Sequence, residues 1–162
     1  MKRAVVLLLA LAVSLPVFAL DAGKKAIFFK APTLQGKGVV DLKAYRGKVV
    51  YLDFWASWCG PCRQSLPLLN EMRNELKNKG FEVIAVNLDE NPADGMKFLK
   101  KFPVDYPVAK DTKGQIVEAY GAETMPTSYI IDKQGVVRMV HNGFKVSDMA
   151  EIREVVAKYL AK

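Results

Sequence analysis

The sequence predicts an α/β fold built around a parallel β-α-β unit, and three consecutive segments carry this prediction. Residues 48–54 are almost entirely apolar, which is typical of a central strand buried on both faces. Apolar residues then recur at helical spacing to about residue 78. A second apolar run, residues 81–88, begins after Gly80, a residue type that often ends helices. A strand, a helix and a second strand in this order favour a parallel crossover.

The sequence predicts a small hairpin before this unit and a short helix after it. Two short strands are expected on either side of residues 36–38, Gly-Lys-Gly, and they lead into a turn at residues 45–47. Pro92 begins the short helix, because proline is well tolerated in a first helical turn, and the helix ends at Phe102 and Pro103.

The last third of the chain is predicted to complete the sheet and to cover it. Residues 114–120 form a further short helix, and residues 128–131 and 136–141 form an antiparallel hairpin. Ser147 is expected to cap a final amphipathic helix. The apolar side of that helix, which faces the sheet, consists of Met149, Ile152, Val155, Val156 and Leu160.

Residues 1–19 have the composition of a secretory signal peptide. Basic residues precede an apolar run, and small residues suit cleavage after Ala19. An uncleaved membrane anchor is the alternative, because the apolar run reaches the lower length limit for spanning a bilayer. Both alternatives place the protein outside the cytoplasm, in the periplasm or an equivalent compartment. A linker, residues 20–27, then leads to one domain, residues 28–162, which is long enough to bury a sizeable core.

The formal net charge of the chain is +7, and the charged residues are scattered along the sequence. No basic stripe interleaved with aromatic residues is present, so we expect no nucleic-acid partner. An ordinary solvated surface is the simplest interpretation of the charges. A binding face for an acidic partner is the alternative.

The only two cysteines, Cys59 and Cys62, are expected to be a redox pair. The predicted strand leads into the predicted helix through Cys59-Gly60-Pro61-Cys62, which places the first thiol over the helix N-terminus. Unsatisfied N–H groups and the helix dipole favour a thiolate there. Two thiols so placed can form a disulfide and reopen it in thiol–disulfide exchange. A purely structural crosslink is not expected, since so small a ring removes little chain entropy.

The segment Asp-Phe-Trp-Ala-Ser-Trp-Cys-Gly-Pro-Cys at residues 53–62 resembles the active-site segment of thioredoxins. Pro67 matches the helix-kinking proline of that family. Residues 124–127, Thr-Met-Pro-Thr, are similar to its cis-proline loop, and Gly143 is similar to its late glycine.

Two further segments, residues 36–48 and 91–102, are similar to the secreted TlpA/ResA branch, whose members are periplasmic or membrane-anchored. The resemblance covers roughly residues 28–160. It implies a thioredoxin fold with an N-terminal β-hairpin extension and a central helical insert.

Cys59 is expected to be the nucleophile and Cys62 the resolving thiol, because Cys59 lies nearer the loop and the solvent. Gly60 and Pro61 are the intervening pair found in thioredoxins, and this resemblance favours a reductant. The resemblance also identifies two acidic candidates for proton transfer to and from Cys62. Asp53 matches the buried aspartate of cytoplasmic thioredoxins, and Glu90 matches the glutamate of TlpA/ResA proteins.

The resemblance implies that clients bind around the cysteines. Met125 and Pro126 would lie opposite them, and a cis peptide bond would let residue 125 pair with an extended client strand. Trp58, Gly60 and Pro61 would complete the apolar docking surface.

No cofactor or metal is expected. One histidine and two cysteines cannot complete a zinc site. Arg63 follows Cys62, so the haem-attachment pattern C-x-x-C-H is missing.

The resulting hypothesis is an exported protein-disulfide oxidoreductase that reduces client disulfides and acts as a monomer. A membrane thiol relay of the DsbD/CcdA type would supply the electrons, and cytochrome c maturation is the process that the TlpA/ResA resemblance implies. A disulfide oxidant or isomerase is the first alternative. A thiol peroxidase is disfavoured because Leu52 and Ala56 replace the proline and threonine that precede the reactive cysteine in such enzymes. A docking module without activity is disfavoured by the intact C-x-x-C.

Overall fold

The structure, a computed structural model, describes residues 20–162. The expected signal peptide or anchor, residues 1–19, therefore lies outside the described residues. A five-stranded mixed sheet forms the centre, in the order β5-β4-β3-β6-β7. These strands are β3 (Val49–Trp55), β4 (Phe81–Asn87), β5 (Val108–Lys110), β6 (Thr127–Ile131) and β7 (Val137–Asn142). Strands β3, β4 and β5 are parallel, whereas β6 is antiparallel to both β3 and β7.

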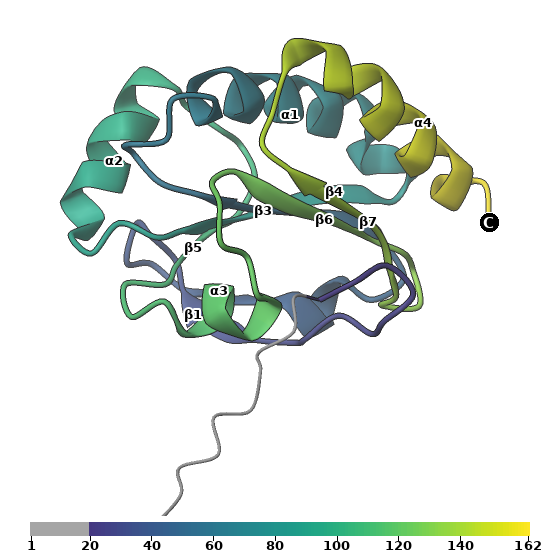
Figure 1. The fold of residues 1–162 in the computed structure, drawn as a ribbon, viewed down its shortest axis with the longest axis horizontal. Helices are drawn as coiled ribbons and strands as arrows, with labels where there is room; N and C mark the ends of the chain where they lie inside the picture. Colours follow the sequence, from purple (N-terminus) through teal and green to yellow (C-terminus); the bar gives the residue numbers. More distant parts are fainter. Residues whose placement is uncertain (1–19) are drawn as a thin grey trace, which may run out of the picture.

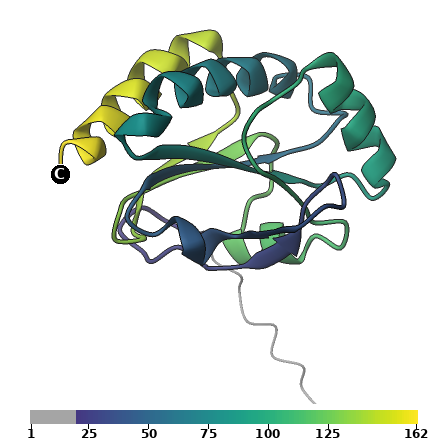
Figure 2. The same ribbon diagram turned by 180° about the vertical axis from the view of Figure 1, so that it is seen from behind.

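The sheet is covered on both faces (Figures 1 and 2). One face carries three helices, α1 (Cys62–Leu76), α2 (Pro92–Lys101) and α4 (Met149–Leu160). The other face carries α3 (Gln115–Tyr120) and a two-stranded antiparallel sheet, β1 (Lys30–Pro32) with β2 (Val39–Asp41). Each face has its own apolar core.

The predicted β-α-β unit is confirmed. Every residue of β3 and β4 is buried, which explains why both strands read as nearly continuous apolar runs. Helix α1 joins them and buries Leu66, Leu69 and Met72 against the sheet, at the spacing of one helical face. A short 3-10 turn, Lys77–Lys79, follows α1, and Gly80 ends it with a left-handed φ of 91°.

The predicted hairpins, the helix at Pro92, the helix at 114–120 and the final helix are also present, with ends that differ by a few residues. Strand β5 was not predicted, because its three residues are too few to show a period. The expected cap at Ser147 is wrong. Ser147 lies within a 3-10 turn, Val146–Asp148, that precedes α4, and the Asp148 carboxylate accepts the Lys145 N–H at 2.7 Å there.

Residues 20–27, expected to be a linker, lie against the domain. The backbone N–H of Leu20 donates to Tyr120, and that of Ala26 donates to Gly135. In the part of the chain that the structure describes, no helix is both long and apolar enough to cross a membrane.

Candidate active site

Cys59 and Cys62 form a disulfide at the point where the chain passes from β3 into α1. Helix α1 begins at Cys62, and Pro61 occupies its N-cap position. The Cys59 N–H donates to the Ala56 carbonyl at 3.1 Å, which closes a turn before the helix. Cys59 is 3% exposed and Cys62 is completely buried. Cys59 is thus the slightly more exposed residue of the pair, which agrees with its expected role as the attacking thiol.

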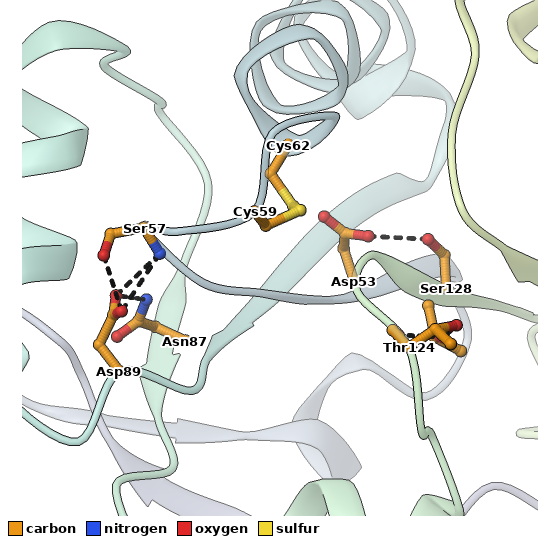
Figure 3. The surroundings of a disulfide bond; sticks show 9 residues. Asp53, Ser57, Cys59, Cys62, Asn87, Asp89, Thr124 and Ser128 are labelled. Carbon is orange, nitrogen blue, oxygen red and sulfur yellow. Dashed lines mark hydrogen bonds between the residues drawn. A yellow bond between two sulfur atoms is a disulfide. The ribbon is translucent and has the colours of Figure 1, made fainter.

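Asp53, in β3, is almost completely buried and lies beside the disulfide (Figure 3). Its Oδ1 accepts a hydrogen bond from the Ser128 hydroxyl at 2.7 Å. Its Oδ2 has no hydrogen-bond partner among residues 20–162 and turns toward the two sulfur atoms in Figure 3. Ser128 reaches Asp53 because the two residues are register partners on the adjacent strands β6 and β3.

Burial raises the pKa of Asp53 from 3.8 to about 7, and the hydrogen bond from Ser128 opposes part of that rise. The carboxyl group therefore gains and loses its proton near neutral pH. Two buried tyrosines, Tyr51 and Tyr106, interact electrostatically with Asp53, and burial raises the pKa of both above the ordinary value of 10. They stay neutral when Asp53 titrates.

Glu90, the second predicted proton carrier, is exposed after the end of β4. Its neighbour Asp89 is buried instead and accepts hydrogen bonds from Ser57 and Asn87. The Ser57 hydroxyl donates to Asp89 Oδ1 at 2.8 Å, the Ser57 N–H donates to Oδ2 at 3.1 Å, and Asn87 Nδ2 donates to Oδ2 at 2.7 Å (Figure 3). Asp89 thereby fastens the loop that precedes Cys59 to the end of β4.

The two tryptophans that precede Cys59 have different environments. Trp58 is 68% exposed beside the disulfide, as a docking residue must be. Trp55 is completely buried, and its ring packs on Phe98 of α2 with the ring centres 5.0 Å apart. Trp55 therefore anchors the start of the loop through its packing on Phe98, and Asp89 holds the loop at Ser57.

The Met125–Pro126 peptide bond is cis, as the resemblance implied. The loop around it is held by Thr127, whose hydroxyl donates to the Thr124 carbonyl at 2.6 Å. The Gly143 N–H donates to the Pro126 carbonyl at 2.7 Å. Gly143 has a φ of 77°, a conformation that favours glycine.

Three functional candidates of this site, Ser57, Asp89 and Ser128, were not predicted from the sequence. Asp89 lies next to Glu90, and the family resemblance indicated only Glu90 as a candidate. Ser128 follows the cis-proline loop directly, and only the pairing of β3 with β6 shows that it faces Asp53. In the described part of the chain, no cluster of three His, Cys, Asp or Glu side chains is arranged to hold a metal ion.

The known proteins that this chain resembles are thiol-disulfide oxidoreductases, in agreement with the geometry of the site. A family model described as Redoxin matches residues 21–156. The thiol-disulfide oxidoreductase ResA of Bacillus thuringiensis subsp. konkukian is 38% identical over 132 residues, covering 82% of this chain and 76% of that protein. The ResA of Geobacillus thermodenitrificans is 33% identical over 151 residues, covering 88% of this chain and 86% of that protein.

Among solved structures, a candidate thiol:disulfide interchange protein DsbE from Chlorobium tepidum has a TM-score of 0.84 and 48% sequence identity. The match covers 88% of this chain and 99% of that one. The fold is thus thioredoxin-like, and the expected class is confirmed, with β1–β2 as the N-terminal hairpin and α2 as the helical insert.

Proposed function

This chain belongs to the Redoxin family and, within it, to the group of ResA thiol-disulfide oxidoreductases, and from that premise we propose that it is exported and reduces the disulfides of client proteins. It is a protein-disulfide oxidoreductase that carries its redox-active disulfide in a C-x-x-C motif. The direction of electron flow, the clients and the electron donor are the proposed parts.

One observation carries the proposal. The Cys59–Cys62 disulfide lies at the start of α1, and the free carboxylate oxygen of Asp53 turns toward it. The site thus combines a cysteine at the edge of the buried core, a second sulfur to resolve the intermediate and a buried group whose pKa of about 7 suits proton transfer.

In the proposed cycle, the Cys59 thiolate attacks one sulfur of a client disulfide, and the other client sulfur leaves as a thiolate that takes up a proton. The Cys62 thiol gives its proton to Asp53 and attacks the sulfur of Cys59, which releases the second client thiolate. Asp53 then returns the proton, directly or through water, so the client ends as a dithiol and the protein as a disulfide. Two electrons and two protons pass to the client.

The proposal also assigns roles in proton transfer and in client binding to residues around the disulfide. Glu90 remains the second candidate for proton transfer, from its exposed position beside Asp89. We place the client on the surface around Trp58, Gly60 and Pro61, and along the Met125–Pro126 edge. The exposure of Trp58 supports this placement.

The composition of residues 1–19 supports export to the periplasm or an equivalent compartment, with or without cleavage. An exported reductant needs a new supply of electrons, and a membrane thiol relay of the DsbD/CcdA type would meet that need. Cytochrome c maturation, with a disulfide in the apocytochrome as the client, is the proposed setting. We propose that the protein acts there as a monomer.

Trapping of intermediates tests the exchange chemistry. Cys62→Ser should accumulate mixed disulfides through Cys59, because no second thiol remains to resolve them. Cys59→Ser should accumulate none. The measurement is mass spectrometry of complexes formed with a disulfide-bonded peptide, and trapping through Cys62 in the Cys59→Ser variant would refute the assigned order of attack.

A further inference from the structure

A groove of about 390 Å³ lies beside the disulfide, between the active-site loop, the start of α1 and helix α2. Ser57 and Arg63 line it on the side of the cysteines. Asp94, Lys97, Phe98, Lys101 and Phe102 line it on the side of α2. The groove therefore belongs both to the redox site and to the helical insert.

The floor of the groove is aromatic and firmly held. Phe98 is only 7% exposed, and its ring packs between Trp55 and Phe102 with ring centres 5.0 and 4.8 Å apart. Trp55 belongs to the central strand β3, so the floor is fixed to the core of the domain. An apolar side chain of a bound segment would find a rigid aromatic surface there.

The rim of the groove is cationic. Arg63, Lys97 and Lys101 are exposed around it, and Asp94 is the one acidic side chain among its lining residues. Among residues 20–162, no carboxylate lies within ion-pair distance of any of these three cations. Their charges are therefore available to a partner.

Two other arginines, Arg73 and Arg138, differ from Arg63 in this respect. Arg73 donates to Glu82 at 2.7 Å, and Arg138 donates to Asp132 at 2.6 Å. Both are thus neutralised by carboxylates of the same domain.

The groove is within reach of a client that is being attacked by Cys59. Ser57 precedes Cys59 by two positions, and Arg63 directly follows Cys62. An extended chain advances by about 3.3–3.6 Å per residue, so client residues roughly two to four positions from the attacked cysteine can reach the rim. The hydrogen bonds from Ser57 to Asp89 hold this wall of the groove in place (Figure 3).

We propose that this groove binds an acidic segment of the client polypeptide, with carboxylates at the rim and one apolar side chain on the aromatic floor. The inference rests on the proposed function, because it assumes that a client disulfide is attacked at Cys59. It adds a selection rule: disulfides flanked by acidic and apolar residues react faster than equivalent disulfides flanked by basic residues. Opposite charges across an interface raise the rate of encounter in this way.

The test uses two synthetic peptides that contain the same intramolecular disulfide and one phenylalanine beside it. Glutamates also flank the disulfide in the first peptide, and lysines take their place in the second. The second-order rate constant of exchange with the reduced parent protein should be roughly 10-fold higher for the glutamate peptide at low ionic strength, and the preference should shrink in salt. In Lys97→Glu/Lys101→Glu the preference should be lost or reversed.

A matched control carries the same change in net charge on exposed lysines that do not line the groove, Lys79→Glu/Lys100→Glu. It should keep most of the preference, so an equal loss in this control would overturn the groove as the cause. Equal rates of the parent protein with both peptides would overturn it too. A dimer of the parent protein in sedimentation that the groove variant loses would assign the groove to a second copy of the chain instead.

Hydroxyethyl disulfide is a small uncharged substrate that cannot occupy the groove and Cys59 together. It therefore separates the groove proposal from the proposed exchange function. Exchange with this substrate but no preference between peptides refutes the groove alone. No exchange with any disulfide refutes the proposed function. The same substrate, measured on every variant, separates damage to the exchange chemistry from loss of peptide selection.

Discussion

At the scale of single residues, Asp53 is an acidic side chain that is almost completely buried and accepts a hydrogen bond from Ser128. Since its pKa rises from 3.8 to about 7 on folding, the folded protein keeps this proton between those pH values while the unfolded chain releases it. The contribution of Asp53 to the free energy of unfolding therefore falls as pH rises from about 4 to about 7 and is constant above that range. At about 1.4 kcal/mol per pKa unit, the fall attributable to Asp53 is at most about 4 kcal/mol.

Asp53→Asn should remove this fall, because an amide does not titrate. Ser128→Ala should extend the fall to higher pH, because the hydrogen bond from Ser128 lowers the pKa of Asp53. Ser128→Thr keeps a hydroxyl group and should restore the pH dependence of the parent protein. The measurement is urea unfolding of the oxidised protein from pH 4 to pH 9, in which the difference between variant and parent isolates this site. Parallel curves for Asp53→Asn and the parent would contradict the prediction.

The candidate residues with a recognisable motif could be predicted from the sequence, whereas those that act through a partner could not. Cys59 and Cys62 are recognised by their spacing, and Asp53 by its match to the buried aspartate of thioredoxins. Ser128 is 75 positions from Asp53, and the contact depends on the register of β6 against β3. No local pattern contains that register.

At the scale of elements, Gly95 of helix α2 lies close to Asn87 at the end of β4, and Asn87 is linked through Asp89 to the active-site loop. A Cβ atom added to Gly95 would lie 2.8–2.9 Å from three side-chain atoms of Asn87, which is too close for real Cβ atoms. Asn87 is completely buried and donates to Asp89, which in turn holds Ser57. The position of α2 thus bears on the loop before Cys59.

Gly95→Ala should lower the free energy of unfolding by about 1–3 kcal/mol, the usual effect of overpacking, and should also slow the exchange reaction. Asn87→Ala in the same chain should recover part of the stability, because it removes the atoms that clash. A double-mutant cycle by chemical denaturation measures that coupling. Additive effects of the two changes would show that the contact does not couple them.

The elements that could be predicted are those with enough residues to show a period. Strands β3 and β4 are seven-residue buried runs, and the start of α1 is marked by Pro61. Strand β5 has three residues, and only its pairing with β4 makes it a strand. Ser147 has the residue type of a cap, but the intervening 3-10 turn moves the start of α4 beyond it.

At the scale of the whole molecule, the redox state of one disulfide is linked to the stability of the entire domain. Folding and reduction form a thermodynamic cycle, so a pair that is more reducing in the folded protein than in the unfolded chain makes the oxidised form the more stable one. For this two-electron couple, 30 mV of difference in potential corresponds to about 1.4 kcal/mol. The direction proposed for electron flow therefore has a consequence for unfolding.

If the protein is a reductant, the oxidised form should unfold at a higher denaturant concentration than the form kept reduced with dithiothreitol, and its measured reduction potential should be correspondingly low. Denaturation followed by circular dichroism, with and without the reductant, measures the difference. A variant with both Cys59→Ser and Cys62→Ser controls for effects of dithiothreitol, to which it should not respond. A reduced form that is the more stable one would assign the protein to disulfide formation instead, because a folded state that favours the dithiol takes electrons from its clients. The thiol–disulfide exchange itself would remain under either outcome, since both directions use the same two sulfur atoms.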